Sequence, residues 1–241
     1  MLTNELFRRA DRREWLFRSA ILTGCLVLPH AIAAETILCS DANVEVSAQT
    51  NEVCKEVCTA AKLTIGFLAG YGLKTTRPVR VSVVEQTIYS DSYSAYGSYD
   101  SRSDLVQIMS PQAITQTMSA PSVNQQPLDS IQYRSIVVHE VAHALIQQNN
   151  QVLPLPLGQA AQEYLACVTQ LSIMPSALRD EMIRKADVGA WESGDVISSV
   201  YMAISPERFA VKSYLHFQRQ PEPGKFVDKL LKSKSRYLNV E

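Results

Sequence analysis

The chain has 241 residues, of which 46% are hydrophobic and 20% charged, and its formal net charge at pH 7 is −1. These values are typical of a folded globular protein and exclude an overall basic character, so we expect no nucleic-acid partner. The length is enough for one domain of ordinary size with a buried core.

Residues 1–34 have the pattern of a secretory signal peptide. Several arginines precede a short apolar run at residues 20–28, and Ala31-Ile32-Ala33 fits a cleavage site made of small residues. The uncharged run at residues 19–34 is shorter than the ~18–20 apolar residues that a membrane span needs. We therefore predict a periplasmic or secreted protein whose mature chain begins near residue 35.

Two alternatives for this N-terminal segment remain open. The sequence from Arg12 to Phe17 resembles a twin-arginine export signal, which would mean that the protein folds before export. The sequence from Leu22 to Cys25 resembles a lipoprotein cleavage box, although the apolar run continues beyond it. We expect contact with a membrane only if the chain is lipidated at Cys25.

Four cysteines remain after the predicted cleavage, at Cys39, Cys54, Cys58 and Cys167. An even number in an oxidising compartment predicts two disulfides. Cys54 and Cys58 are four residues apart on a predicted helix, where a mutual bond has poor geometry. We therefore expect one of them to bond to Cys39 and the other to Cys167.

Hydrophobic patterning predicts the first elements of the mature chain. Residues 35–47 are expected to be irregular or extended, and residues 48–69 have the period of a helix. Valines alternate with polar residues in the strand predicted at 78–84, and a second strand is predicted at 104–109. The Ser- and Tyr-rich residues 90–103 between them are expected to form a surface loop or hairpin connection.

The second half of the mature chain is predicted to be helical. After a loop at residues 110–128 with one short helix at 112–118, Asp129 or Ser130 is a suitable N-cap for a helix that runs to Gln148. Further helices are expected at 158–174, 176–187, 195–204, 206–218 and 223–233. No repeat or composition break divides the mature chain. We predict a single α+β domain over 35–241, mixed at 35–130 and helical at 131–241.

The chemically distinctive segment is His139-Glu140-Val141-Ala142-His143, an H-E-x-x-H motif on the helix that ends at Gln148. Histidines four residues apart lie on one face of a helix and can bind one Zn²⁺, while Glu140 can reach a water without ligating the metal. The apolar flanks bury this helix, and a buried Glu140 is costly unless it is paired or near a metal. The motif therefore predicts a zinc site.

Glu163 is the candidate third ligand, 20 positions after His143 on its own apolar helix. Pro154 and Pro156 lie in the link between the two helices and would turn the chain back. Glu163 would then face the histidines and complete a His₂Glu site with an open fourth position.

His139, Glu140, His143 and Glu163 resemble the gluzincin group of zinc metallopeptidases, which includes the thermolysin-like and zinc aminopeptidase families; we expect a small secreted bacterial branch. The predicted order over residues 48–174 is similar to the zincin core, with a backing helix, a small sheet, the motif helix and the glutamate helix. The resemblance implies a zinc-activated water, Glu140 as its general base, and a peptide or protein substrate extended along an edge strand at 104–109. Thermolysin-like members have an Asp that orients a histidine ligand where this chain has Cys167.

The resemblance also implies a downstream Tyr or His that stabilises the oxyanion of the tetrahedral intermediate. The candidates are Tyr201, Tyr214 and His216. Tyr214 and His216 are two residues apart on one predicted helix, so both cannot face one site. We favour Tyr214.

Two functions follow from these observations. The first is a secreted or periplasmic zinc-dependent peptidase with Glu140 as the general base. The alternative is a non-catalytic, zinc-stabilised zincin scaffold that binds envelope proteins or peptides. The substrate, the mode of cleavage and the oligomeric state are left open by the sequence.

Overall fold

The computed structural model describes residues 35–90, 93–117, 122–123, 126–154, 157–235 and 237–240. The signal-peptide prediction, together with its twin-arginine and lipoprotein alternatives, lies outside these residues. The described residues belong to one compact unit and combine helices with a small mixed sheet, which confirms the predicted α+β class. None of the described helices is both long and apolar enough to cross a membrane.

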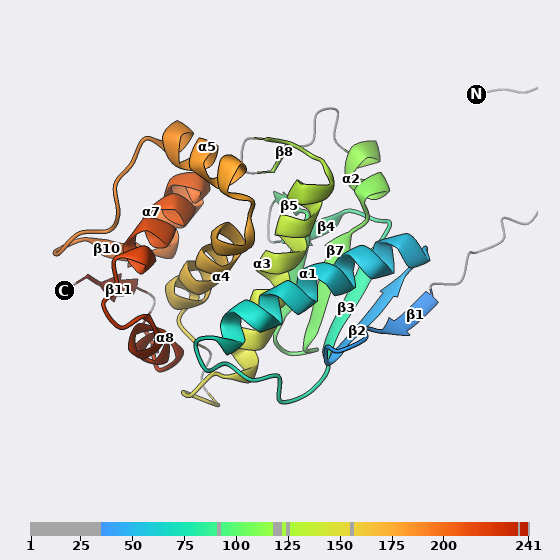
Figure 1. Cartoon of the computed structure of the whole chain (residues 1–241), viewed down its shortest axis with the longest axis horizontal. Helices are drawn as coiled ribbons and strands as arrows, with labels where there is room; N and C mark the ends of the chain where they lie inside the picture. Colours follow the sequence, from blue (N-terminus) through green and yellow to red (C-terminus); the bar gives the residue numbers. More distant parts are fainter. Residues whose placement is uncertain are drawn as a thin grey trace, which may run out of the picture. The chain divides into compact units, whose positions relative to one another are not determined.

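A five-stranded sheet with the order β1-β2-β3-β7-β6 forms one layer (Figure 1). Its strands are β1 (Glu35–Leu38), β2 (Val44–Ala48), β3 (Val79–Val84), β6 (Gly97–Asp100) and β7 (Leu105–Met109). The three central strands are parallel, whereas β1 and β6 pair antiparallel at the two edges. The strands predicted at 78–84 and 104–109 are confirmed as β3 and β7, and the predicted extended segment at 35–47 contains β1 and most of β2.

The edge of the sheet differs from the prediction. β7 is an interior strand with β3 on one side and β6 on the other, so residues 104–109 are not the edge. Residues 90–103, which were expected to form a loop or connection, contain β5 (Tyr93–Ala95) and the edge strand β6. The sequence of β6 is Gly-Ser-Tyr-Asp, in which glycine and aspartate disfavour strands, and its structure comes from pairing with β7.

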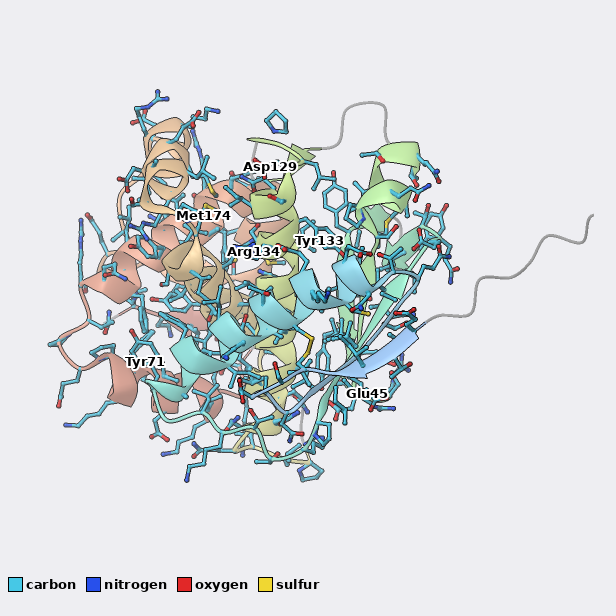
Figure 2. The ribbon with its side chains drawn as sticks, turned by 45° about the vertical axis from the view of Figure 1, so that its right-hand side comes forward. Glu45, Tyr71, Asp129, Tyr133, Arg134 and Met174 are labelled. Carbon is cyan, nitrogen blue, oxygen red and sulfur yellow. A yellow bond between two sulfur atoms is a disulfide. The ribbon has the colours of Figure 1, made fainter. Side chains whose placement is uncertain are left out.

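Helices α1 (Asn51–Ala69) and α3 (Ser130–Gln148) pack against one another and contact the sheet, and α4 (Gln159–Ile173) packs on α3. The predicted N-cap of α3 is confirmed, because the Asp129 side chain accepts a hydrogen bond of 2.8 Å from the backbone N–H of Gln132. α3 buries apolar residues all round its axis, as expected of a central helix. Arg134 of α3, labelled in Figure 2, also forms a half-buried ion pair of 2.9 Å with Glu56 of α1.

The remaining helices are α2 (Pro111–Thr117), α5 (Ser176–Ala186), α6 (Ser199–Ile204), α7 (Pro206–Gln218) and α8 (Pro223–Leu231). They lie close to the predicted spans, except that residues 196–198 form a strand. This strand, β10 (Val196–Ser198), pairs with β11 (Tyr237–Asn239), so the region predicted to be helical contains a two-stranded sheet. The other short strands are β4 (Ile88–Ser90), β8 (Ser122–Val123) and β9 (Gln126–Pro127).

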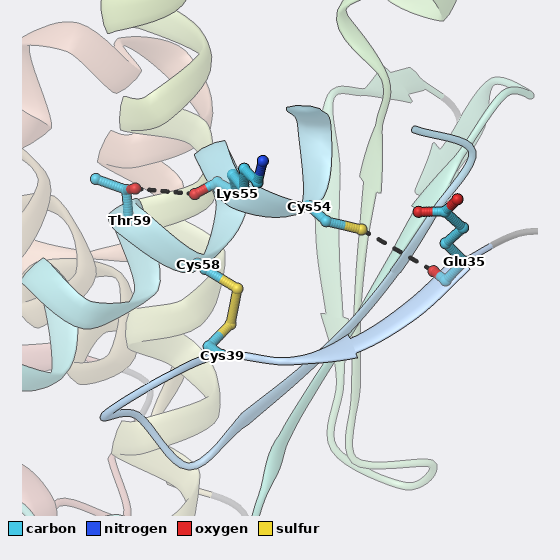
Figure 3. The surroundings of a disulfide bond; sticks show 6 residues. All are labelled: Glu35, Cys39, Cys54, Lys55, Cys58 and Thr59. Atoms are coloured by element: carbon cyan, nitrogen blue, oxygen red, sulfur yellow. Dashed lines mark hydrogen bonds between the residues drawn. A yellow bond between two sulfur atoms is a disulfide. The ribbon is translucent and has the colours of Figure 1, made fainter. Parts of the chain in front are cut away.

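One disulfide joins Cys39, just after β1, to Cys58 of α1, with a Cα–Cα distance of 5.4 Å (Figure 3). This confirms the expected bond to Cys39. The second predicted disulfide is wrong, because Cys54 and Cys167 are free, buried thiols. Cys54 faces β1, where its Sγ lies 3.9 Å from the carbonyl oxygen of Glu35. Cys167 lies on α4 and interacts with His139 instead.

Candidate metal centre

Three predicted ligands meet where α3 and α4 pack together. The Nε2 atoms of His139 and His143 are 3.1 Å apart. Oε2 of Glu163 lies 3.4 Å from Nε2 of His139 and 3.6 Å from Nε2 of His143. Each residue therefore offers a donor atom to a common point, and the group could hold a metal ion.

The link between α3 and α4 is held by hydrogen bonds to the last residue of α8 and to the segment that follows it. The backbone N–H of Gln151 donates to the carbonyl oxygen of Leu231, and the N–H of Gly158 donates to that of Ser233. A side chain at position 158 would overlap the backbone oxygen of Ser235, so this approach requires glycine. The predicted reversal of the chain is confirmed, and Glu163 faces the histidines one turn into α4.

The three side chains are largely buried, with 20%, 11% and 19% of His139, His143 and Glu163 exposed. Burial alone would raise the pKa of Glu163, but the two neighbouring histidines outweigh it and lower this pKa. Burial alone would lower the pKa of His139, but Cys167 and Glu163 outweigh it and raise this pKa well above its ordinary value. These surroundings thus favour an ionised Glu163 carboxylate beside the imidazoles.

Glu140 interacts with the three residues that could hold a metal ion but does not belong to that group. Its carboxylate interacts electrostatically with His139, His143 and Glu163, and burial raises its pKa above the ordinary value. Glu140 also lies against the edge strand β6, where a Cβ added to Gly97 would stand 2.6 Å from Cγ of Glu140. The Glu140 side chain is therefore close to the edge of the sheet and interacts electrostatically with the three residues of the group.

Tyr214 is not brought to this group by any contact of the described residues. Its ring lies 5.4 Å from the guanidinium carbon of Arg179 on α5. Nη1 of Arg179 in turn lies 3.5 Å from the carbonyl oxygen of Leu171, which is two turns along α4 from Glu163. Tyr214 therefore belongs to the packing of α5 against α7.

The two other oxyanion candidates also have contacts elsewhere. His216 is buried, and its Nδ1 lies 2.7 Å from the hydroxyl of Tyr164. Tyr201 packs edge-on against Trp191, with ring centroids 5.0 Å apart. These contacts show that both residues take part in the packing of the helices.

The structure adds two residues that the sequence prediction did not assign to the site, Cys167 and Gly97. Cys167 lies one turn after Glu163 on α4, and its thiol interacts with the His139 imidazole. The buried Nδ1 of His139 has no hydrogen bond of regular geometry to a described residue. The Cys167 thiol is therefore one of the few polar groups that interact with this ring. The spacing of four residues from Glu163 was the available signal for Cys167, and a glycine within a strand was the signal for Gly97.

Comparison with known proteins identifies the family. Residues 44–239 match a family model described as a family of unknown function (DUF6639). No curated protein and no solved structure shows a significant match to the chain. The matched residues make up well over half of the sequence and include His139, Glu140, His143 and Glu163, so the chain belongs to the DUF6639 family.

Proposed function

We propose that this protein is a zinc-dependent peptidase with His139, His143 and Glu163 as ligands and Glu140 as general base. The observation that carries the proposal is the set of donor–donor distances, 3.1, 3.4 and 3.6 Å. Ligands bound to a tetrahedral zinc ion at about 2.0–2.1 Å are separated by about 3.3 Å, so the three donors fit this ion. Two imidazoles and one carboxylate are also a donor set used by catalytic zinc, with a fourth position left for water or substrate.

The division of roles follows from the arrangement of the side chains. A zinc ion held there would supply Lewis-acid chemistry, polarising a carbonyl and lowering the pKa of a water toward about 7. Glu140 interacts with the three proposed ligands but is not one of them, so its carboxylate can accept and donate a proton. In this proposal Glu140 accepts a proton from the attacking water and passes it to the leaving amine.

The edge strand β6 is the surface that would hold a peptide beside Glu140. Gly97 is paired with Ile108, and the carbonyl of Tyr96 accepts a hydrogen bond of 2.8 Å from the N–H of Met109. This pattern makes Gly97–Ile108 a non-hydrogen-bonded pair, so the N–H and C=O of Gly97 point away from β7, and those of Tyr99 do so as well. An extended substrate could therefore add to β6 as a further strand, in place of the position along 104–109 that the sequence suggested.

Export belongs to the same proposal. The disulfide between Cys39 and Cys58 suits an oxidising compartment such as the periplasm or the exterior. The predicted signal peptide ends directly before β1, so its removal would leave the described fold intact. A zincin-like core is supported by the order of α1, β3, β7, α3 and α4 along the chain.

A second candidate is a non-catalytic zinc-stabilised scaffold that binds envelope proteins or peptides. The position of Tyr214 against Arg179 favours it, because the residue chosen as oxyanion donor has its contact away from the ligand group. A general base next to three ligands favours the peptidase, since a purely structural zinc more often has four protein ligands.

The test uses the mature protein, residues 35–241, with its zinc content measured alongside cleavage of a chemically unfolded protein. We expect one zinc per chain and cleavage that stops with a chelator and returns with zinc. His143→Ala should lose both zinc and cleavage, whereas Glu52→Gln, at an exposed site on α1, should retain both. Absence of zinc at neutral pH would contradict both candidates, and bound zinc without cleavage would select the scaffold.

A further inference from the structure

We infer that Gly97 is a positioning residue whose missing side chain leaves the space that the Glu140 side chain occupies. A Cβ built at position 97 would lie 2.6 Å from Cγ, 3.1 Å from Cδ and 3.2 Å from Oε1 of Glu140. These are the three nearest atoms, so the free space in front of Gly97 is filled by Glu140. The consequence for catalysis rests on the proposed peptidase function, whereas the steric relationship does not.

The backbone does not require glycine at this position. Gly72 and Gly194 have φ values of 89° and 90°, in the region that favours glycine, but Gly97 is not among the residues with positive φ. Gly97 instead lies in a regular antiparallel pairing with Ile108. Glycine within a strand weakens it and often marks the close approach of another group. Here the approaching group is Glu140.

Several contacts hold the edge strand β6 in place, so we expect it not to move away from Glu140. The hydrogen bond between the Tyr96 carbonyl and the Met109 N–H fixes its register next to Gly97. At its other end the Tyr99 hydroxyl donates a hydrogen bond of 2.7 Å to Asp104, which also forms an ion pair with Arg77. α3 is fixed in turn by its packing between α1 and α4.

The flexible partner in this contact is therefore the Glu140 side chain itself. A methyl group at position 97 should leave the fold and the three ligands in place while it turns the carboxylate away. A displacement of about 1 Å at a reacting group can cost on the order of 100-fold in rate. Gly97→Ala should thus lower kcat by about that factor and leave zinc affinity and KM nearly unchanged.

A double-mutant cycle tests the contact without relying on activity. Tm is measured for zinc-loaded wild type, Gly97→Ala, Glu140→Ala and the double variant. We expect Gly97→Ala to raise Tm more when residue 140 is alanine than when it is glutamate, because only glutamate opposes the new methyl group. Gly66→Ala on α1 is the matched control, since its added Cβ meets nothing within 4 Å, and it should keep full activity.

Additive changes in Tm would overturn the inference, and so would wild-type kcat in Gly97→Ala. A loss of zinc affinity of more than about tenfold would also overturn the inference, because an effect of that size would mean that residue 97 acts on the metal ligands rather than on Glu140. If zinc-loaded wild type cleaves nothing, the proposed peptidase fails, and the cycle alone then decides whether Gly97 sets the place of Glu140.

Discussion

The carboxylate of Glu163 lies 3.4 Å from Nε2 of His139, although Glu163 belongs to α4 and His139 to α3. The proposed ligands thus join two helices that also share an apolar contact. A metal ion bound there would act on the stability of the fold as well as on chemistry, because it binds the folded chain and not the unfolded one. Both effects can be measured separately.

Glu163→Gln should weaken zinc binding while preserving the shape of the site. The amide keeps the volume of the carboxylate but loses its charge and one good ligand for zinc. We expect the zinc affinity to fall by at least about 100-fold. Changes to residues that only support metal ligands cost up to about that factor, and a change to a ligand itself should cost at least as much. Competition with a chromogenic chelator measures it, and Glu52→Gln on α1 is the matched control.

The same variant should lose the thermal stabilisation that zinc provides. Zinc at 100 times its dissociation constant stabilises the folded state by about 2.7 kcal/mol, which is roughly 5–10 °C in Tm for a chain of this size. Wild type should show this rise on zinc addition and Glu163→Gln should not. An equal rise in both proteins would show that zinc binds elsewhere.

The cysteines should give two thiols and one disulfide in the mature protein. Cys54 and Cys167 are buried, so they should resist alkylation in the native state and react when the chain is unfolded without reductant. Mass spectrometry should then find two labels, and Cys54→Ala should reduce the number to one. Failure to label any cysteine of the unfolded wild type would restore the prediction of two disulfides.

Gly158→Ala should destabilise the protein by displacing the segment after α8. The new Cβ would overlap the backbone oxygen of Ser235, and a backbone atom cannot move aside as a side-chain end can. Overpacking of this kind costs about 1–3 kcal/mol. Chemical unfolding measures the loss, and Gly189→Ala, whose added Cβ meets nothing within 4 Å, should show no comparable loss.

Asp104→Asn should remove a pH-dependent part of the stability. Burial raises the pKa of Asp104, but hydrogen bonds from Arg77 and Tyr99 outweigh it, so the net pKa is lowered in the folded state. A lowered carboxyl pKa contributes stability above the unfolded value of about 3.9, and this contribution is lost as pH falls through the folded value. Asparagine suits the positive φ of this residue, 51°, so the backbone should be undisturbed.

The size of this effect is limited by solvent, since 47% of the Arg77 side chain is exposed. We expect about 1 kcal/mol, or roughly 2–4 °C in Tm, between wild type and Asp104→Asn at pH 5–7. The difference should shrink below about pH 4. A difference that persists unchanged at pH 3 would contradict the assignment to the Asp104 carboxylate.

The features that the sequence predicted most accurately are those that depend on the spacing of residues close together in the chain. His139 and His143 share a face of α3 because they are four residues apart, and Glu163 was found because an apolar helix follows a turn of the right length. The N-cap Asp129 was visible for the same reason. The elements around these residues, β3, β7, α1 and α4, have clear periodic patterns.

What the sequence did not predict depends on partners distant in the chain. β6 and β10 are strands because β7 and β11 pair with them, and neither has a strong pattern of its own. The surroundings of Cys167 are set by the packing of α4 on α3, which places its thiol against His139 instead of another cysteine. The contact of Tyr214 with Arg179 likewise depends on where α5 packs.

In the proposed peptidase, Glu140 acts as a base beside a metal held by His139, His143 and Glu163. The most direct measurement compares zinc-loaded wild type with zinc-loaded Glu140→Gln on the same unfolded protein substrate. We predict one zinc per chain in both proteins, cleavage by wild type, and a loss of about 100-fold or more in Glu140→Gln. Equal cleavage by both proteins, with zinc bound in each, would contradict the role of Glu140.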